Sequence, residues 1–435
     1  MGYIRNIMYG NDLKEKARVH KKDFTRTRKV GFLTLMCIIL NMIKKSTQLE
    51  IDEFLKRFNP EGVNIKTYTK QSFSEARQKL SPEAFTILND AFIEKFYEDG
   101  DFKKYKGYRL LAIDGCSTEV PNNIETREYF GYVKNQSKEL KLARALSSKV
   151  YDVENKLLVS SILGRCDTSE RELAIKNIEK IQGMWNGSIK DLILFDRGYP
   201  SLAFISYLNS KGIKFLMRAP MSCLSEIRCT QTIDENVEIK VTKDRAKELK
   251  RQGTPMPTGT IIKLRVLRIM LDTGEIEILI TNLIQNELSH EESKDLYFKR
   301  WGIETKFDEL KNKFEIENFS GEKPLIVEQD YYATVLLSNI ASIFEQEAEE
   351  ELNEQNAKKS LKHEYKINKN ILVGKLKNNL IEILLEENSM QKSILYSQFL
   401  EEIKRNVVPV IKNRAFERNK IIRSNKYSKA RKRAL

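Results

Sequence analysis

RLLAID at residues 109–114 and DLILFD at residues 191–196 are two short apolar runs, and each ends in a carboxylate. Their length and aliphatic content predict buried strands. Helical patterns and a further apolar run follow, at 168–181, 201–210 and 213–218. Strands that alternate with helices indicate an α/β domain. Ligands of such domains gather at the carboxyl ends of the strands, which makes Asp114 and Asp196 candidate site residues.

Two carboxylates at such a place are energetically costly unless cations neutralise them. Mg²⁺ takes oxygen ligands and combines a few protein carboxylates with phosphate oxygens. Two such ions about 3.5–4 Å apart stabilise both the attacking and the leaving oxygen of a phosphodiester. Asp114 and Asp196 therefore favour metal-dependent chemistry on phosphate. For either aspartate alone, the ordinary alternative is a helix cap or a turn residue.

A third element is YFKRWGIETKFDELK at residues 297–311, which we read as a helix. At about 100° per residue, one face within about 60° carries four polar residues: Tyr297, Arg300, Glu304 and Lys311. The carboxylate suits a metal ion, and the other three side chains suit phosphate oxygens. A solvated charged face is the ordinary alternative. Asp308 lies one turn from Glu304 and is a rival metal ligand on geometry alone.

The pattern along the chain predicts three domains. Residues 1–105 are all-helical in pattern, and their short helices around a polar, basic one at 70–80 favour either a helix-turn-helix-like DNA reader or a helical cap that only packs. Residues 106–320 form the α/β domain, with an all-β insertion at about 220–285. Residues 321–435 form a helical region with a basic tail.

The positive charge of the chain lies at its two ends. The net charge is +14, but residues 1–30 carry +6 and residues 404–435 carry +11, so the rest of the chain carries −3. Basic ends of this kind commonly bind a polyanion through counterion release. A pair of solvated, disordered tails is the alternative.

Several function classes are disfavoured. The five cysteines are scattered without a CxxC pair, which argues against a disulfide framework or a zinc site and fits a reducing, cytoplasmic compartment. The N-terminus lacks a signal-peptide pattern, and the most apolar run, at 30–43, is too short to span a bilayer. The three histidines form no HxH or HExxH motif, and no Walker-type phosphate loop is present.

Three motifs resemble one known family. Tyr297, Arg300, Glu304 and Lys311 have the spacing Tyr-x2-Arg-x3-Glu-x6-Lys, the YREK signature of the insertion-sequence-four family of DDE transposases. Asp196-Arg197-Gly198-Tyr199 is similar to the second motif of that family, and Asp114-Gly115 is similar to the first. The three motifs occur along the chain in the same order as in that family. The long stretch between Asp196 and Glu304 resembles the β-rich insertion of the family.

The resemblance implies an RNase H-like catalytic core whose metal triad is Asp114, Asp196 and Glu304. It implies two Mg²⁺ ions as cofactor, with Mn²⁺ as a substitute. It also implies contacts to the DNA phosphates from a set of five residues: Tyr297, Arg300, Lys311, Arg197 and Tyr199. The partners would be double-stranded DNA, at the terminal inverted repeats and at the target, and a second copy of the chain in a homodimeric synaptic complex, with no membrane involved.

The activity that the resemblance implies is cut-and-paste transposition in the bacterial cytoplasm, at the nucleoid, through a DNA hairpin with a flipped base. Some relatives stack that base on a tryptophan of the insertion, whereas the two tryptophans here are Trp185 and Trp301. Two other functions stay open on the residues: an RNase H-like DNA nuclease without strand transfer, and a DNA-binding regulator derived from a transposase. The intact triad disfavours the regulator, which needs no aligned carboxylates.

Overall fold

The computed structural model describes residues 2–26, 30–58, 68–134, 141–185, 187–271, 273–357, 361 and 363–411. The chain divides into two compact units. The first comprises Met1–Glu98, Ser117–Ala145 and Asp308–Leu435, and the second comprises Asp99–Cys116 and Leu146–Phe307. The N-terminal and C-terminal helices thus belong to one unit. The boundaries of the three domains predicted from the sequence differ from those of the two compact units. The division into three functional domains stays a prediction.

Helices make up the described N-terminal part of the first unit, as predicted. They are α1 (Gly2–Tyr9), α2 (Asn11–Lys16), α3 (Phe32–Leu40), α4 (Thr47–Phe58), α5 (Lys70–Arg77) and α6 (Glu83–Tyr97). Helix α3 is the most apolar run and is buried along almost its whole length. Thr69 caps α5, because its hydroxyl accepts a hydrogen bond of 3.1 Å from the Ser72 backbone N–H.

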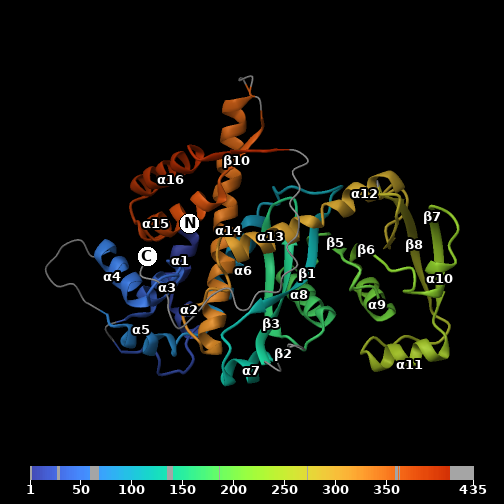
Figure 1. Ribbon diagram of the computed structural model, residues 1–435, viewed down its shortest axis with the longest axis horizontal. Coiled ribbons are helices and arrows are strands. Elements are labelled where there is room, and N and C mark those ends of the chain that lie inside the picture. Colours follow the sequence, from blue (N-terminus) through green and yellow to red (C-terminus); the bar gives the residue numbers. More distant parts are fainter. Residues whose placement is uncertain are drawn as a thin grey trace. The chain divides into compact units, whose positions relative to one another are not determined.

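A long helix, α14 (Pro324–Asn356), runs through the first unit, and Figure 1 shows the blue N-terminal helices and the red C-terminal ones around it. Proline at its first turn suits a helix start. Buried Arg77 fastens α5 to it, with 2.8 Å from Nε to the Gln329 side chain and 2.7 Å from Nη2 to Asp330. The remaining elements of this unit are α7 (Ile124–Phe130), β2 (Tyr132–Lys134), α15 (Lys369–Leu385), α16 (Ser389–Lys404) and the antiparallel pair β10 (Tyr365–Ile367) and β11 (Val407–Pro409).

The second unit is built on a mixed sheet, in agreement with the predicted α/β class. Its strands run in the order β3-β1-β5-β6-β9-β8-β7, and β4 pairs with β3. They are β1 (Arg109–Glu119), β3 (Lys141–Asp152), β4 (Leu157–Arg165), β5 (Asp191–Phe195), β6 (Lys214–Arg218), β7 (Asp234–Lys240), β8 (Ile261–Met270) and β9 (Ile276–Thr281). Strand β1 pairs parallel with β5, and β5 pairs parallel with β6. Helices α8 (Glu170–Trp185) and α9 (Leu202–Ser210) belong to this unit, and α8 packs against β4.

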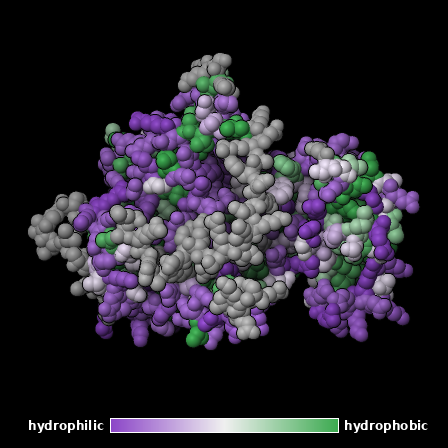
Figure 2. All heavy atoms as spheres, viewed as in Figure 1, coloured by the Kyte–Doolittle hydropathy of each residue, from purple (hydrophilic) through white to green (hydrophobic). Residues whose placement is uncertain are grey.

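The predicted all-β insertion is wrong in part, because it contains helices. Residues 220–285 include α10 (Ser225–Arg228) and α11 (Lys243–Arg251) beside β7, β8 and β9. Helix α11 is short and almost wholly polar, with Leu249 as its one buried residue, and the side chain of Thr242 caps its N-terminus. Strand β9 pairs antiparallel with β6, so these strands extend the sheet. Figure 2 shows apolar residues gathered over β7 and β8, where Ile233, Ile261 and Met270 are exposed.

The predicted single helix over 297–311 is also wrong, because it is broken. Helix α12 (His290–Phe298) ends before Arg300, and α13 (Trp301–Asn312) begins after it. Across the break the backbone N–H of Arg300 bonds the Tyr297 carbonyl at 3.0 Å, a tighter i→i−3 turn. Tyr297, Arg300 and Glu304 therefore stand on a helix, a turn and a second helix, so the rotation of 100° per residue does not relate them.

Among the residues that the structure describes, no helix is both long enough and apolar enough to cross a membrane.

Candidate catalytic site

Asp114 and Asp196 lie at the same level of two neighbouring strands. The parallel register of β1 and β5 runs from Arg109 opposite Asp191 to Ala112 opposite Leu194, an offset of 82 residues. Asp114 and Asp196 differ by the same 82 residues, so they stand side by side two residues past the last of these pairs. Strand β1 continues to Glu119, so Asp114 does not end it as the sequence had indicated. The aspartate lies instead where the parallel pairing ends.

The electrostatics of Asp114 reflect this neighbour. Burial and, after it, the negative charge of Asp196 raise the pKa of Asp114 to about 7, although the Gly115 N–H and Arg300 act in the opposite direction. The Gly115 N–H donates to Asp114 Oδ1 at 2.8 Å. In the same way the Gly198 N–H donates to Asp196 Oδ1 at 2.8 Å. Each of the two carboxylates thus accepts a backbone hydrogen bond at Oδ1 and can still offer oxygens to a cation. Their surroundings disfavour two negative charges that no cation compensates.

Arg300 is the cation of this site. Its Nη1 lies 3.7 Å from Asp114 Oδ2, and its Nη2 lies 2.8 Å from Glu304 Oε1. The guanidinium carbon also lies 5.7 Å from the centre of the Tyr297 ring. Only 7% of the Arg300 side chain is exposed, and its buried Nε has no hydrogen-bond partner among the described residues. The structure therefore joins Glu304 to Asp114 through an arginine, which the sequence had assigned to phosphate.

The other residues predicted for this helix differ in their surroundings. Burial raises the pKa of Tyr297 to about 12, so it stays a neutral phenol. Lys311 lies at the far end of α13, where its Nζ donates to the Ser117 carbonyl at 2.8 Å and lies 3.3 Å from Glu317. Asp308, the rival ligand, is exposed and accepts a hydrogen bond from Asn312.

The second motif forms a turn after β5. Arg197 is exposed, as a phosphate contact requires, whereas Tyr199 is completely buried. The Tyr199 ring packs against Phe195 and Phe204, with centroid distances of 5.2 and 5.8 Å. The predicted DNA contact of Tyr199 stays untested, but in this structure its hydroxyl faces the interior.

Sequence reasoning missed Glu170, the first residue of α8. Its negative charge acts on both Asp114 and Asp196, and its own pKa is raised by partial burial and by Asp196. No signal in the sequence pointed to it, because an acidic residue in the first turn of a helix is ordinary. Only the packing of α8 brings it to the aspartates.

The acidic site fits a divalent cation in its chemistry. Its donors are carboxylate oxygens, which hard cations prefer. Gly115 and Gly198 leave room beside them: a Cβ on Gly115 would lie 2.8 Å from Glu170 Cδ, and one on Gly198 would lie 3.1 Å from Asp196 Oδ1. Within the described ranges, however, no three acidic, histidine or cysteine side chains converge closely enough to hold one ion. Glu304 in particular bonds Arg300 instead.

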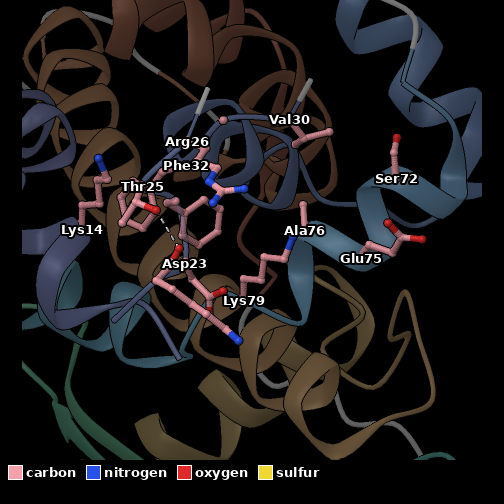
Figure 3. Close-up of a pocket in the computed structure, with 13 residues that line it drawn as sticks. Lys14, Asp23, Thr25, Arg26, Val30, Phe32, Ser72, Glu75, Ala76 and Lys79 are labelled. Carbon is pink, nitrogen blue, oxygen red and sulfur yellow. Dashed lines mark hydrogen bonds between the residues drawn. The ribbon is translucent and has the colours of Figure 1, made fainter. Parts of the chain in front are cut away.

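A second feature is a pocket of about 1020 Å³ in the first unit, beside α5. Figure 3 shows Lys14, Arg26 and Lys79 around it, together with the acidic residues Asp23 and Glu75. Lys70, Gln71 and Ser74, three of the polar residues of the predicted DNA-reading helix, are exposed on α5. Arg77, a fourth, is buried in its bonds to α14 and cannot read DNA in this conformation.

Comparisons with known proteins relate this chain to one family. The family model for the transposase DDE domain matches residues 105–340. A search of curated proteins found no match. Among solved structures, the chain is similar to one in the cryo-EM structure of the piggyBac transposase synaptic complex with hairpin DNA, with a TM-score of 0.41 and 10% identity, over 90% of this chain and 76% of that one. A likeness of that degree supports no conclusion about activity.

Proposed function

We propose, on the premise that this chain belongs to the family with the transposase DDE domain, that it cuts and joins DNA with Asp114, Asp196 and Glu304 as its catalytic carboxylates. The family is one of enzymes that cleave and transfer DNA strands, and this chain is such an enzyme. The observation that carries the assignment is the register of β1 and β5, in which the 82-residue offset between the strands equals the spacing of the two aspartates.

The three carboxylates would hold divalent cations, Mg²⁺ or Mn²⁺, as the DDE family implies. When bound, a pair of such ions neutralises charge on the phosphate and activates the attacking oxygen. Asp114 and Asp196 contribute fixed oxygens, because the Gly115 and Gly198 N–H groups orient them. Glu304 is 32% exposed at the start of α13, and its Oε1 bonds the Arg300 side chain.

Arg300 is the residue that would link DNA binding to the carboxylates. A phosphate presents oxygens in the geometry of a guanidinium fork and would compete with Glu304 and Asp114 for it. With Arg300 bonded to a phosphate, the Glu304 carboxylate would no longer share this guanidinium and would be one of the residues to hold a cation. Tyr297 packs against Arg300 and holds it in place. We assign Arg197 and Lys311 to phosphates farther from the cut, on the resemblance and because Arg197 is exposed and Lys311 is partly exposed.

The finer assignment is to cut-and-paste transposition of an insertion sequence of the YREK group, through a DNA hairpin and in a homodimeric synaptic complex. We also infer that the sheet of the second unit is an RNase H-like core, which its mixed pairing and its two aspartates on neighbouring parallel strands support. The exposed polar residues of α5 favour a DNA contact by the N-terminal helices over a purely packing role.

The test is cleavage and joining of a DNA duplex that carries the inverted repeats flanking the gene. Asp114→Asn and Asp196→Asn should abolish nicking while DNA affinity stays near that of the parent, because metal-bound carboxylates act on chemistry and basic groups hold phosphate. Asp167→Asn is the matched control, since Asp167 is 62% exposed and pairs with Arg165. If Asp114→Asn or Asp196→Asn nicks DNA at the parental rate, the assignment of the catalytic carboxylates is wrong. Nicking by the parent without joining would instead favour the nuclease.

A further inference from the structure

Helix α11 of the insertion is held by one face and presents the other to solvent. Leu249 is buried at 1% exposure, and the Thr242 side chain caps the N-terminus of the helix. Arg245 donates from Nη1 to Glu226 Oε1 at 2.6 Å and from Nη2 to Glu226 Oε2 at 3.0 Å. Its Nη1 also donates to the Lys240 carbonyl at 3.0 Å. These contacts fasten α11 to α10 and to the end of β7 (Figure 1).

Three lysines stand on the outer face of α11. At about 100° per residue, Lys243, Lys247 and Lys250 fall within about 60° of one another, and Leu249 lies about 100–160° away from them. All three lysines are exposed, and none of them forms an ion pair with a carboxylate of the described residues. Asp244 is exposed as well, but it lies on the flank, about 60–120° from the lysines. We call Lys243, Lys247 and Lys250 the lysine face.

The positive charge of the insertion is concentrated on this helix. Residues 220–285 carry ten basic and nine acidic residues, whereas Lys243–Arg251 alone carries five basic and two acidic ones. Two arginines of the neighbouring strand are used in the fold, since Arg265 pairs with Asp234 and Arg268 bonds Thr230. Figure 2 shows hydrophilic residues over α11, beside the apolar ones over β7 and β8. The lysine face is therefore a compact cationic surface that makes no such bond.

A row of lysines on a helix is complementary in charge to the backbone of duplex DNA. From Lys243 to Lys250 the helix rises about 10 Å. Duplex DNA carries one negative charge for about every 1.7 Å of its axis, so several phosphates come within reach of these side chains. Lysine contacts phosphate as a point charge, and phosphate contacts carry no sequence information. The lysine face therefore suits a duplex of arbitrary sequence. The ordinary alternative is a solvated face without a partner.

We propose that the lysine face of α11 binds the phosphate backbone of the target DNA, the duplex to which the enzyme joins a cut end. The inference rests on the proposed function and adds a partner surface to it. The proposed reaction needs two duplexes, an inverted repeat that is recognised by its sequence and a target. A surface of lysines alone cannot distinguish one sequence from another, so it fits the target and not the repeat.

The experiment compares the full-length parent with a variant that combines Lys243→Gln, Lys247→Gln and Lys250→Gln. Binding to a labelled duplex of random sequence is measured at several salt concentrations. The variant should bind about tenfold more weakly or worse at about 0.1 M salt, and the slope of log affinity against log salt should flatten by about 0.9 for each lysine that contacts a phosphate. Arginine at the same three positions keeps the charge and should restore both values.

A matched control removes the same charge elsewhere. It combines Lys95→Gln, Lys176→Gln and Lys375→Gln, because these lysines have side chains that are 40–54% exposed and each already pairs with a carboxylate. The control should bind the random duplex as the parent does. Urea unfolding should give the parental free energy for the lysine-face variant, since its three side chains take no part in the contacts that hold α11.

Strand joining, measured on the same preparations, assigns the DNA. Joining to a target duplex should fall about tenfold more than nicking of a duplex that carries the inverted repeats. Equal loss of joining and nicking would place the repeat on the lysine face and overturn the assignment to the target. A parental salt slope, or equal weakening in the control, would overturn the DNA contact itself. If the parent neither nicks nor joins, the proposed function is wrong, whereas the binding comparison still decides whether α11 contacts duplex DNA.

Discussion

Replacement of Arg300 should slow DNA chemistry far more than it destabilises the fold. The guanidinium lies 2.8 Å from Glu304 and 3.7 Å from Asp114, with only 7% of the side chain exposed. A hydrogen bond between charged groups contributes about 1.5–3 kcal/mol, and since Glu304 is 32% exposed the lower value, about 1.5 kcal/mol, applies to unfolding.

For the reaction the loss is larger, because the arginine would hold the phosphate as charge develops. Removal of one such donor costs about 3–4 kcal/mol, which is a factor of about 10²–10³ in rate. Arg300→Lys keeps the charge but not the planar fork, so it should fall between the parent and Arg300→Ala. Lys299→Ala is the control, since Lys299 is the neighbouring cation, is 40% exposed and pairs with Glu154.

The assay is single-turnover nicking, hairpin formation and joining, with Mn²⁺ binding and urea unfolding measured on the same preparations. Arg300→Ala should bind Mn²⁺ at least as well as the parent, because it removes a cation from between two carboxylates. Parental rates at every step for both Arg300 variants would refute the phosphate role. A loss of rate that is fully explained by unfolding would refute it as well.

Three further outcomes are expected. Glu304→Gln should lower nicking about a hundredfold or more, while Asp308→Asn, whose side chain is exposed, should nick within about threefold of the parent, and the reverse order would make Asp308 the third ligand. Asp330→Asn should lower the free energy of unfolding at pH 7 by about 3 kcal/mol, because it leaves Arg77 buried without its anion. Burial alone would raise the pKa of Asp330, but Arg77 and Ser320 hold it below its usual 3.8, so the stabilisation by the ion pair is complete above pH 3.8 and is lost as the pH falls through the folded-state pKa. Urea unfolding from pH 7 to pH 3 should therefore show a shrinking difference in unfolding free energy between the parent and Asp330→Asn. A difference that does not depend on pH would contradict the ion pair. Residues 412–435 carry ten basic residues and one acidic residue and lie outside the described residues. Their removal should weaken binding to all DNA and flatten the slope of log affinity against log salt by about 0.9 for each phosphate that the tail neutralises. An unchanged slope would mean that the tail does not contact DNA.

The structure determines where the C-terminal tail can be removed without damage to the fold. A cut after Lys404, where the basic stretch begins, would remove β11, which pairs with β10. It would also disturb buried Lys404, which bonds Glu351. A cut after Ile411 avoids both. Weaker DNA binding after this cut is then due to the lost contacts between the basic tail and the phosphates, and not to a loss of fold.

Much of the local structure could be predicted because it depends on near neighbours. The helix over 47–58, the cap at Thr69 and the strands at 109 and 191 follow from apolar period and capping chemistry. Helix α11 was missed because it is short and strongly charged and offers a single leucine to the core, whereas the segment around it has the composition of strands. The break at Arg300 was missed for another reason: no proline stands near it, and a single glycine, Gly302, is tolerated within helices, so the turn shows only in its backbone hydrogen bonds.

The sequence by itself determined that two carboxylates follow apolar strands, that a Tyr-Arg-Glu-Lys pattern comes later, and that positive charge gathers at the ends. These are properties of residue type and spacing. Only the tertiary structure decided that Asp114 and Asp196 stand side by side, since that depends on which strands pair and in what register. It also joined Arg300 to Glu304 and brought Glu170 to the aspartates, because the approach of a helix to a sheet is set by packing between segments distant in sequence.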